Sequence, residues 1–322
     1  MSHSSDYLLA LDWGTSSVRA FLMQNAKVID TRQSSQGIQH LPAAGVPGFE
    51  QAFEAIAGDW VQRWPTLAVV ASGMVGSAQG WREAPYVQCP ADVQMLVQHS
   101  IRVPSGVGPD LVIAPGVLLD PPGQTPDVMR GEEIQIAGAL SENPQWAERC
   151  CMVLPGTHSK WVSVREGRLV HFSTYMTGEL FAMLCQHSIL GRLMPADRGS
   201  TREPDAPAFE LGLAQARSGR PGDLTHQIFA TRTLGLTGRL QPAALADYLS
   251  GLLIGSELVS GMDNLQEMEA MPLVLIGEPA LCKRYANALR TFGQPVAAVL
   301  GNTAAQGLWN FAVAAGLLPA AH

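Results

Sequence analysis

Short hydrophobic runs separated by polar turns and helical segments recur along the chain. In the first part, Tyr7–Asp12, Val18–Met23, Leu67–Ala71 and Leu111–Ala114 are apolar runs of strand length. A helix is predicted around Phe49–Trp64. Because strands and helices alternate, this part of the chain is predicted to be α/β.

The second half begins with the same kind of pattern. Cys151–Leu154, Trp161–Val164 and Arg168–Tyr175 are predicted strands, and a long helix is predicted at Gly178–Met194, before a mostly helical stretch that ends near residue 262. The last predicted elements are a strand at Leu273–Ile276, a helix at Pro279–Phe292, a strand at Val296–Leu300 and a helix at Ala304–Ala315. The length of 322 residues allows two cores, so we predict two domains, 1–145 and 146–322.

A weak internal repeat connects the two halves. Gly14-Thr15-Ser16-Ser17 follows the first predicted strand and Gly156-Thr157-His158-Ser159 follows the strand that opens the second half, so both turns read G-T-x-S. A duplication would give two similar lobes whose turns face each other across a cleft. Such turns offer backbone N–H groups and hydroxyls for close approach to phosphate oxygens. Either turn alone would be read as an ordinary hairpin, whereas the pair favours a nucleotide.

Asp12 ends the first apolar strand, directly before the first of these turns. A carboxylate is costly there unless it is paired, so it has a specific partner. One interpretation is that Asp12 accepts backbone hydrogen bonds within the turn. The other is that it holds the Mg²⁺ of MgATP through water, because Mg²⁺ favours carboxylates together with substrate phosphates.

Composition and charge narrow the class of protein. Hydrophobic residues make up 47% and charged residues only 15%, against roughly 25% charged in an average globular protein, so much of the chain is expected to be buried. The net charge of −7, with no block of Lys or Arg, argues against nucleic acid as a partner. Five cysteines without C-x-x-C spacing, no signal peptide and no apolar run of about 18 residues predict a cytoplasmic protein without membrane contact.

Several longer segments are specific when taken together. They are LALDWGTSSVRAFLM at Leu9–Met23, SGMVGSAQGW at Ser72–Trp81, MRGEEIQIAGAL at Met129–Leu140, LPGTHSKWV at Leu154–Val162 and STYMTGELFAMLCQHSIL at Ser173–Leu190. In these segments the chain resembles the 2-dehydro-3-deoxygalactonokinases of the actin, hexokinase and heat-shock-ATPase superfold. The resemblance implies a two-lobed α/β fold, ribonuclease H-like in each lobe, with an ATP cleft between the lobes. It also implies ATP, Mg²⁺ and transfer of phosphate to the 6-hydroxyl of 2-dehydro-3-deoxy-D-galactonate in galactonate breakdown.

The resemblance assigns the nucleotide-binding residues. Gly14, Thr15 and Ser16 match the first phosphate loop, with Asp12 toward the metal, and Gly156 and Thr157 match the second. The adenosine loop matches Gly277 and Glu278, where the superfold often has Gly-Gly. Glu278 is therefore expected either to reach the ribose or to cap the following helix. Thr177 is expected to cap the helix that it opens, with substrate contact as the alternative.

The acceptor side is assigned to the Gly-rich segment and to an arginine. Ser77 and Gln79 are expected to hydrogen-bond the sugar hydroxyls, and Trp81 either stacks on the sugar or belongs to the core. The guanidinium of an arginine suits the carboxylate of a sugar acid, and Arg82 and Arg130 both lie beside the matched motifs. Arg130 is the predicted ligand.

Glu132 is the predicted general base and Glu133 the alternative. The glycerol-kinase type places a Gly-Asp pair at a helix start a couple of dozen residues before its Gly-Thr loop, and Gly131-Glu132 stands at a similar interval before Gly156. Adjacent helical residues point about 100° apart, so only one carboxylate can face the site squarely. The alternative role for both is to complement the positive end of the helix.

Two other functions remain open at this point. One is a kinase of the same superfold that acts on another sugar acid or sugar. The other is a non-catalytic actin-like protein that binds ATP and changes shape, a function that leaves the paired Glu132 and Glu133 unexplained. The oligomeric state is open, with a homodimer as one alternative.

Overall fold

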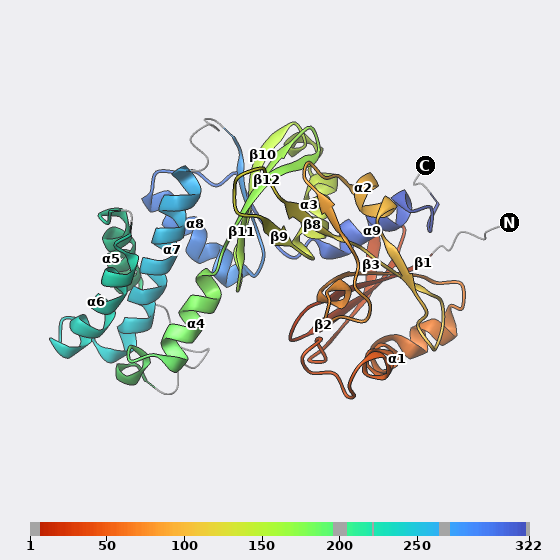
Figure 1. The fold of residues 1–322 in the computed structure, drawn as a ribbon, viewed down its shortest axis with the longest axis horizontal. Helices are drawn as coiled ribbons and strands as arrows, with labels where there is room; N and C mark the ends of the chain where they lie inside the picture. Colours follow the sequence, from red (N-terminus) through yellow and green to blue (C-terminus); the bar gives the residue numbers. More distant parts are fainter. Residues whose placement is uncertain (1–6, 196–204, 221, 264–270, 320–322) are drawn as a thin grey trace. The chain divides into compact units, whose positions relative to one another are not determined.

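The structure is a computed structural model that describes residues 7–195, 205–220, 222–263 and 271–319 (Figure 1). Contacts divide the chain into two compact units. The first unit comprises Met1–Cys150, Val162–Phe172 and Asn302–His322, and the second comprises Cys151–Trp161 and Ser173–Gly301. The boundary expected between residues 145 and 146 lies near the first of these divisions. Residues 302–322, expected in the C-terminal domain, belong to the first unit.

The first unit contains a six-stranded mixed sheet of order β3-β2-β1-β4-β7-β6. Its strands are β1 (Tyr7–Trp13), β2 (Val18–Gln24), β3 (Lys27–Ser34), β4 (Ala68–Gly73), β6 (Ile101–Val103) and β7 (Leu111–Ile113). Strands β1 to β3 form an antiparallel meander, while β1, β4 and β7 run parallel. Parallel strands end at the same edge, and there Asp12 is paired with Ser72 and Trp13 with Gly73. This edge therefore carries the carboxylate predicted to bind metal.

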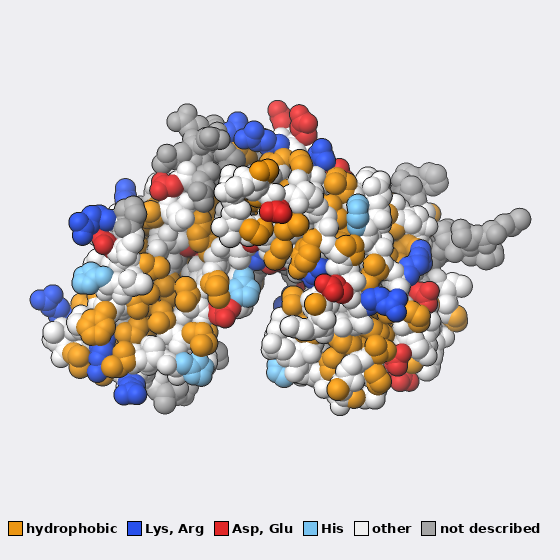
Figure 2. Space-filling view, viewed as in Figure 1, with side chains coloured by type: hydrophobic (Ala, Val, Ile, Leu, Met, Phe, Trp, Pro, Cys, Tyr) orange, Lys and Arg blue, Asp and Glu red, His pale blue; other side chains and the backbone are white. Residues whose placement is uncertain are grey.

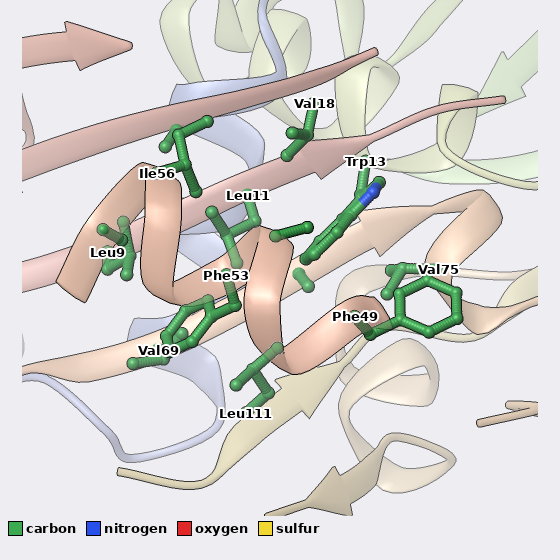
Figure 3. Packing of buried hydrophobic residues seen from close by; sticks show 14 of the residues in the cluster. Leu9, Leu11, Trp13, Val18, Phe49, Phe53, Ile56, Val69, Val75 and Leu111 are labelled. Carbon is green, nitrogen blue, oxygen red and sulfur yellow. The ribbon is translucent and has the colours of Figure 1, made fainter. Parts of the chain in front are cut away.

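Helix α1 (Val46–Arg63) packs on one face of this sheet. Its residues Phe49, Phe53 and Ile56 recur at helical spacing and are buried against the strands (Figure 3). Trp13, the last residue of β1, lies in the same cluster, with its ring 5.6 Å from that of Phe49. The carboxyl end of β1 is thus anchored immediately after Asp12.

Helices α3 (Glu132–Glu142) and α9 (Ala304–Ala314) pack together in the first unit, where α9 also contacts β1 and β4. Two glycines let the helix backbones touch. A Cβ atom at Gly138 would lie 2.1 Å from the carbonyl oxygen of Thr303, and one at Gly307 would lie 1.9 Å from that of Ile134. A larger residue at either position would force the two helices apart.

A small three-stranded sheet of order β5-β8-β9 leads into α3. Its strands are β5 (Tyr86–Gln88), β8 (Gly116–Leu119) and β9 (Asp127–Met129), and helix α2 (Val93–Gln98) follows β5. The sequence analysis did not predict this sheet, because strands of three or four residues give too little periodicity. Its last strand ends at Met129, so it delivers Arg130 and Gly131 to the start of α3.

The second sheet repeats the order of the first. It runs β12-β11-β10-β13-β14, so a meander of three consecutive strands is again followed by strands from later in the chain. Its strands are β10 (Arg149–Leu154), β11 (Ser159–Arg165), β12 (Arg168–Tyr175), β13 (Leu273–Ile276) and β14 (Ala298–Leu300). Here too the first strand of the meander has a parallel neighbour, since β10 pairs with β13 and β13 with β14. The shared order agrees with the duplication that the two G-T-x-S turns indicated.

The helices of the second unit come mostly from the segment between β12 and β13. They are α4 (Thr177–His187), α5 (Ala206–Arg217), α6 (Leu224–Leu236), α7 (Leu245–Asp263) and, after β13, α8 (Pro279–Thr291). The helix predicted at Gly178–Met194 ends earlier, because Ser188 has an extended backbone and only a 3-10 turn at Gly191–Leu193 follows. In Figure 2, hydrophobic side chains are visible over α4 to α6, where Met183, Phe229 and Leu236 are exposed.

The segment Pro242–Asp263, which contains α7, is long and apolar enough to cross a membrane. In the protein, 72% of its most apolar 18-residue window is buried. The two glycines Gly212 and Gly251 let α5 and α7 touch, since a Cβ at Gly251 would lie 2.0 Å from the carbonyl oxygen of Phe209. Helix α7 is therefore a core helix of the second unit.

Candidate active site

Asp12 lies half-buried at the carboxyl edge of the first sheet. The side-chain amide of Asn302, just before α9, donates to its Oδ2 at 3.2 Å, and Arg19 lies 3.8 Å away. Burial raises the pKa of Asp12 above its usual value and the charge of Glu132 adds to the rise, while Asn302 and Arg19 oppose it. The carboxylate has few neutralising partners in its own unit, which is the setting in which a cation would bind.

Two glycines bring the start of α3 to this edge. Gly73 has φ of +92°, and a Cβ there would lie 2.8 Å from the carbonyl oxygen of Trp13. Gly131 has φ of +110°, and a Cβ there would lie 3.2 Å from the Cα of Gly73. Both conformations and both contacts suit glycine alone. The backbones of β1, β4 and the α3 N-terminus are therefore stacked in direct contact.

Glu132 and Glu133, the first two residues of α3, occupy different environments. Glu133 is fully buried, and both of its carboxylate oxygens accept from the N–H of Gly131, at 2.9 and 2.7 Å. Burial, followed by the charge of Glu132, raises the pKa of Glu133 to about 8. Glu132 is half-buried, and its Oε2 accepts from the N–H of Arg130 at 3.1 Å. Of the two carboxylates, Glu132 is the more accessible one, and its charge acts on Asp12.

We expect Glu133→Gln to stabilise the protein increasingly as pH rises. Between the usual pKa of 4.5 and the folded-state pKa of about 8, the folded protein keeps a proton on Glu133 that the unfolded chain releases. The free energy of unfolding therefore falls as pH rises through that window. Thermal unfolding at about pH 5 and about pH 9 should show that the Tm gain of the variant over the parent is larger at the higher pH. Each kcal/mol gained in the free energy of unfolding corresponds to roughly 2–4 °C in Tm.

The matched control is Glu142→Gln at the exposed end of the same helix, whose Tm difference from the parent should not depend on pH. A Tm difference for Glu133→Gln that is the same at both pH values would contradict the buried protonated state.

The residues predicted to bind the sugar acid include buried polar atoms without a hydrogen-bond partner among the described residues. These atoms are the hydroxyls of Ser72 and Ser77, Nε1 of Trp81, and Nε and Nη1 of Arg130. Arg130 Nη2 donates to the carbonyl of Ala84 at 2.9 Å, and its guanidinium lies over the ring of Tyr86. Gly76 keeps the space beside this group open, since a Cβ there would lie 3.1 Å from Nη1. A fixed guanidinium with two unsatisfied donors suits a ligand carboxylate.

The other predicted acceptor residues lie differently. Trp81 is 5% exposed and stacks on Phe49 at 5.6 Å, within the aromatic cluster that includes Trp13. The structure thus places its ring in the core, which is the alternative that the sequence left open. Gln79 and Arg82 are exposed, whereas Arg130 is half-buried.

The first turn lies directly after β1. The N–H of Gly14 donates to the carbonyl of Ser17 at 2.9 Å, while Thr15 and Ser16 are exposed. The segment that follows β3 supports this turn, because Ile38 donates to Gly14 and a Cβ at Gly37 would lie 2.4 Å from the backbone of Ser16. The turn is therefore a fixed structure with its small side chains outward.

The second turn has the same outward character in its own unit. Thr157 is exposed, and no atom lies within 4 Å of a Cβ built on Gly156. Helix α4 begins against this turn: a Cβ at Gly178 would lie 2.3 Å from the carbonyl oxygen of Gly156, and the N–H of Glu179 donates to Thr157 at 3.0 Å. His158 pairs with Glu179 at 2.5 Å. Among the described residues of its own unit, the Cβ side of Gly156 is therefore open.

Gly277 lies near the second turn, since a Cβ on it would be 3.4 Å from the carbonyl oxygen of Pro155. Its φ of +151° suits glycine. Glu278 caps α8, with its carboxylate accepting from the N–H groups of Ala280 at 3.0 Å and Leu281 at 2.7 Å. This is the capping role that the sequence left open beside a ribose contact.

Thr177 does not cap α4, so that prediction was wrong. Met176 is the capping residue and makes no side-chain hydrogen bond to the helix. The buried hydroxyl of Thr177 instead bonds to Glu257 of α7.

Sequence reasoning missed Asn302 and Glu257. Asn302 stands before a predicted helix, where its Oδ1 accepts from the N–H of Ala304 at 2.8 Å, so a cap was predictable while the reach to Asp12 was not. Glu257 lies in a run of apolar residues in α7. A single acid in such a run was the feature of the sequence that could have indicated a buried carboxylate with specific partners.

The duplicated strand order, with a Gly-Thr turn after the first strand of each sheet, is the arrangement of the actin/hexokinase-like ATPases, and the chain has that fold. The (R)-2-hydroxyglutaryl-CoA dehydratase component A of Acidaminococcus fermentans is similar in fold alone, with a TM-score of 0.50 and 12% identity over 97% of each chain. Within this fold the sequence is that of a sugar-acid kinase.

The chain belongs to the 2-keto-3-deoxy-galactonokinase family, whose model matches residues 12–311. It is 35% identical to the 2-dehydro-3-deoxygalactonokinase of Escherichia coli (strain K12), over 92% of this chain and 94% of that protein. A relative from Rhizobium meliloti (strain 1021) is 33% identical, over 92% of this chain and 93% of that protein. A solved structure from Sinorhizobium meliloti, named for the same kinase, has a TM-score of 0.82 and 32% identity and covers 96% of this chain and 99% of its own.

Proposed function

We propose that this protein transfers the γ-phosphoryl group of ATP to the 6-hydroxyl of 2-dehydro-3-deoxy-D-galactonate. Family membership over residues 12–311 supports the reaction class. The structural observation that carries the proposal is the Arg130 guanidinium, which is held by Ala84 and Tyr86 and has two buried nitrogens without a hydrogen-bond partner in the described part of the chain. A sugar acid brings the carboxylate that would satisfy them.

On this proposal, Ser77 and Arg130 orient the acceptor while Glu132 removes its proton. The Ser77 hydroxyl is another buried polar atom without a partner among the described residues, and Ser77 directly follows Gly76, where a Cβ would lie 3.1 Å from Nη1 of Arg130. Glu132 accepts the hydroxyl proton as the sugar oxygen forms its bond to the γ-phosphorus and the bond to the β-phosphate oxygen breaks. Phosphoryl transfer otherwise depends on positioning and charge neutralisation.

The residues around Asp12 fit Mg²⁺. Asp12 supplies hard carboxylate oxygens, and burial, with the charge of Glu132, raises its pKa, which a nearby cation would offset. Among the described residues, no group of three or more His, Cys, Asp or Glu side chains is arranged around a common point. The fit is therefore to a metal held by one or two carboxylates, substrate phosphates and water. When bound, Mg²⁺ would neutralise charge on the phosphates.

The turns at Gly14 and Gly156 are proposed to hold ATP phosphates. We expect Gly156→Val to abolish ATP binding without unfolding the protein, because no atom of the described residues lies within 4 Å of the Cβ position and the φ of Gly156 is not in the left-handed region. Calorimetry with ATP is the measurement, and an unchanged Tm is its control. Normal ATP affinity in a folded Gly156→Val protein would remove this turn from the nucleotide site.

The reaction is tested by measuring ATP consumption with 2-dehydro-3-deoxy-D-galactonate and with its gluconate epimer in parallel. Dependence on the galactonate compound supports the proposal. Preference for the epimer would indicate another sugar-acid kinase, and slow turnover that is indifferent to sugar acids would indicate a nucleotide-binding protein without this activity.

We also propose a cytoplasmic location. The five cysteines, all of them in the described part of the chain, are free thiols, as a reducing compartment requires. Burial raises the pKa of Cys150 to about 12 and that of Cys282 to about 11, so both are unreactive. A homodimer stays a prediction.

A further inference from the structure

Glu257 is a buried carboxylate on α7 that is 3% exposed and that the proposed reaction does not use. Its Oε1 accepts from Nε1 of Trp161 at 2.8 Å and its Oε2 from the hydroxyl of Tyr285 at 2.7 Å. Thr177 also hydrogen-bonds to it, and Ser159 is linked to it through the hydroxyl of Tyr285. Four elements, β11, α4, α7 and α8, thus meet at a single side chain.

Two residues linked to Glu257, Ser159 through Tyr285 and Thr177 directly, lie on either side of the second turn. Ser159 is the last residue of the Gly156–Ser159 turn, and Thr177 directly precedes Gly178, the residue that packs against the carbonyl of Gly156. The two partners are far apart in sequence and are joined through this carboxylate. Glu257 therefore holds both the end of the Gly156–Ser159 turn and the start of α4, the helix that packs on this turn.

The direction of the hydrogen bonds is fixed from the turn toward the carboxylate. Tyr285 donates its single proton to Glu257, so in the 3.0 Å contact between Ser159 Oγ and Tyr285 Oη the serine is the donor. Ser159 Oγ in turn accepts from the N–H of Gly156 at 3.4 Å. Tyr285 remains protonated because burial and the charge of Glu257 raise its pKa well above the usual value. The chain runs from Gly156 through Ser159 and Tyr285 to Glu257.

The helix geometry prepares this arrangement. Gly261 lies one turn after Glu257 on the same side of α7, and a Cβ on it would lie 2.7 Å from the indole ring of Trp161. The indole therefore rests directly on α7, with its N–H at the carboxylate. An acid is costly to bury, and Glu257 is compensated by hydrogen bonds from Trp161, Tyr285 and Thr177.

We propose that Glu257 is a positioning residue that fixes the second phosphate turn through Tyr285 and Ser159 and so sets the affinity for ATP. The inference rests on the proposed function in that the turn is taken to bind ATP phosphates. The network acts on nucleotide affinity because a preorganised turn has no ordering cost when ATP binds. Ser77, Arg130 and Glu132 belong to the other unit.

The test compares Tyr285→Phe with the parent. The change removes one hydroxyl from a buried ring and leaves Glu257 and Ser159 in place. We expect KM for ATP to rise and ATP affinity by calorimetry to fall, each by roughly tenfold, while kcat and KM for the sugar acid stay within about twofold. Glu257→Gln replaces the two acceptor oxygens of the carboxylate with one amide oxygen. It should likewise weaken ATP binding while kcat and KM for the sugar acid stay near those of the parent.

Tyr175→Phe is the matched control, because it makes the same chemical change at a tyrosine of this unit whose hydroxyl bonds to Ser260, at 3.1 Å. It should retain the ATP affinity of the parent. Parent-like ATP affinity in Tyr285→Phe and Glu257→Gln would overturn the proposal, and so would a loss of kcat with both KM values unchanged, which is the result of a lower folded fraction. If the parent has no kinase activity, the proposed function fails, and calorimetry with ATP still decides the role of the network.

Discussion

Glu132→Gln is expected to lower kcat by about 10²–10⁴-fold, the contribution typical of a general base. This range corresponds to roughly 3–5 kcal/mol of activation free energy. Gln keeps the shape of Glu and can still accept the N–H of Arg130, but it cannot take a proton from the sugar hydroxyl. Steady-state kinetics should show the loss in kcat, with ATP and sugar acid still binding.

Glu133→Gln is the matched variant, because it makes the same chemical change at the next residue of α3. Glu133 is fully buried and accepts from the N–H of Gly131, so the kcat of the Glu133→Gln variant should stay near that of the parent. Collapse of kcat in Glu133→Gln together with retention in Glu132→Gln would move the base by one residue. Retention of kcat in both variants would remove the base from this helix.

Asp12→Asn is expected to abolish most of kcat and to raise the Mg²⁺ concentration needed for half-maximal rate. The reason is that a neutral amide is a poor ligand for a hard divalent cation. The fold should persist, because the substitution removes a carboxylate whose pKa is raised by burial and by the charge of Glu132. The Tm of Asp12→Asn should therefore be no lower than that of the parent.

Asp59→Asn is a suitable control for this change. Asp59 is an exposed carboxylate of α1 in the same unit that is already paired with Arg32, and the variant should keep the parent kcat and Mg²⁺ dependence. If Asp12→Asn also keeps both, Asp12 has no role at the metal.

The sheet framework was predictable because its strands are apolar and of ordinary length. The strand at Leu273–Ile276 and the meander strand at Arg168–Tyr175 were predicted with their observed bounds. The duplication was visible only as two short G-T-x-S turns, yet it extends to the order of the strands in both sheets. Local sequence patterns therefore located the turns, and the strand order confirmed the relationship between the halves.

Long-range contacts were the part that sequence could not provide. The stacking of Gly73 and Gly131, the position of Asn302 beside Asp12 and the hydrogen bonds of Glu257 join residues that are distant along the chain. No periodicity reports such pairs, and conformation at a glycine is invisible until the neighbouring backbone is known. The different burial of Glu132 and Glu133 is of the same kind, since sequence showed only two adjacent acids.

The packing of α9 on α3 has a consequence for biosynthesis. Asn302 and α9 emerge from the ribosome after every residue of the second unit, yet they complete the unit that contains β1. Gly138 and Gly307 leave no room for a loose or partial docking of α9. The first unit must therefore wait, with part of its apolar surface uncovered, until the second unit has been made. A nascent chain that ends before residue 302 should accordingly be a preferred client of chaperones.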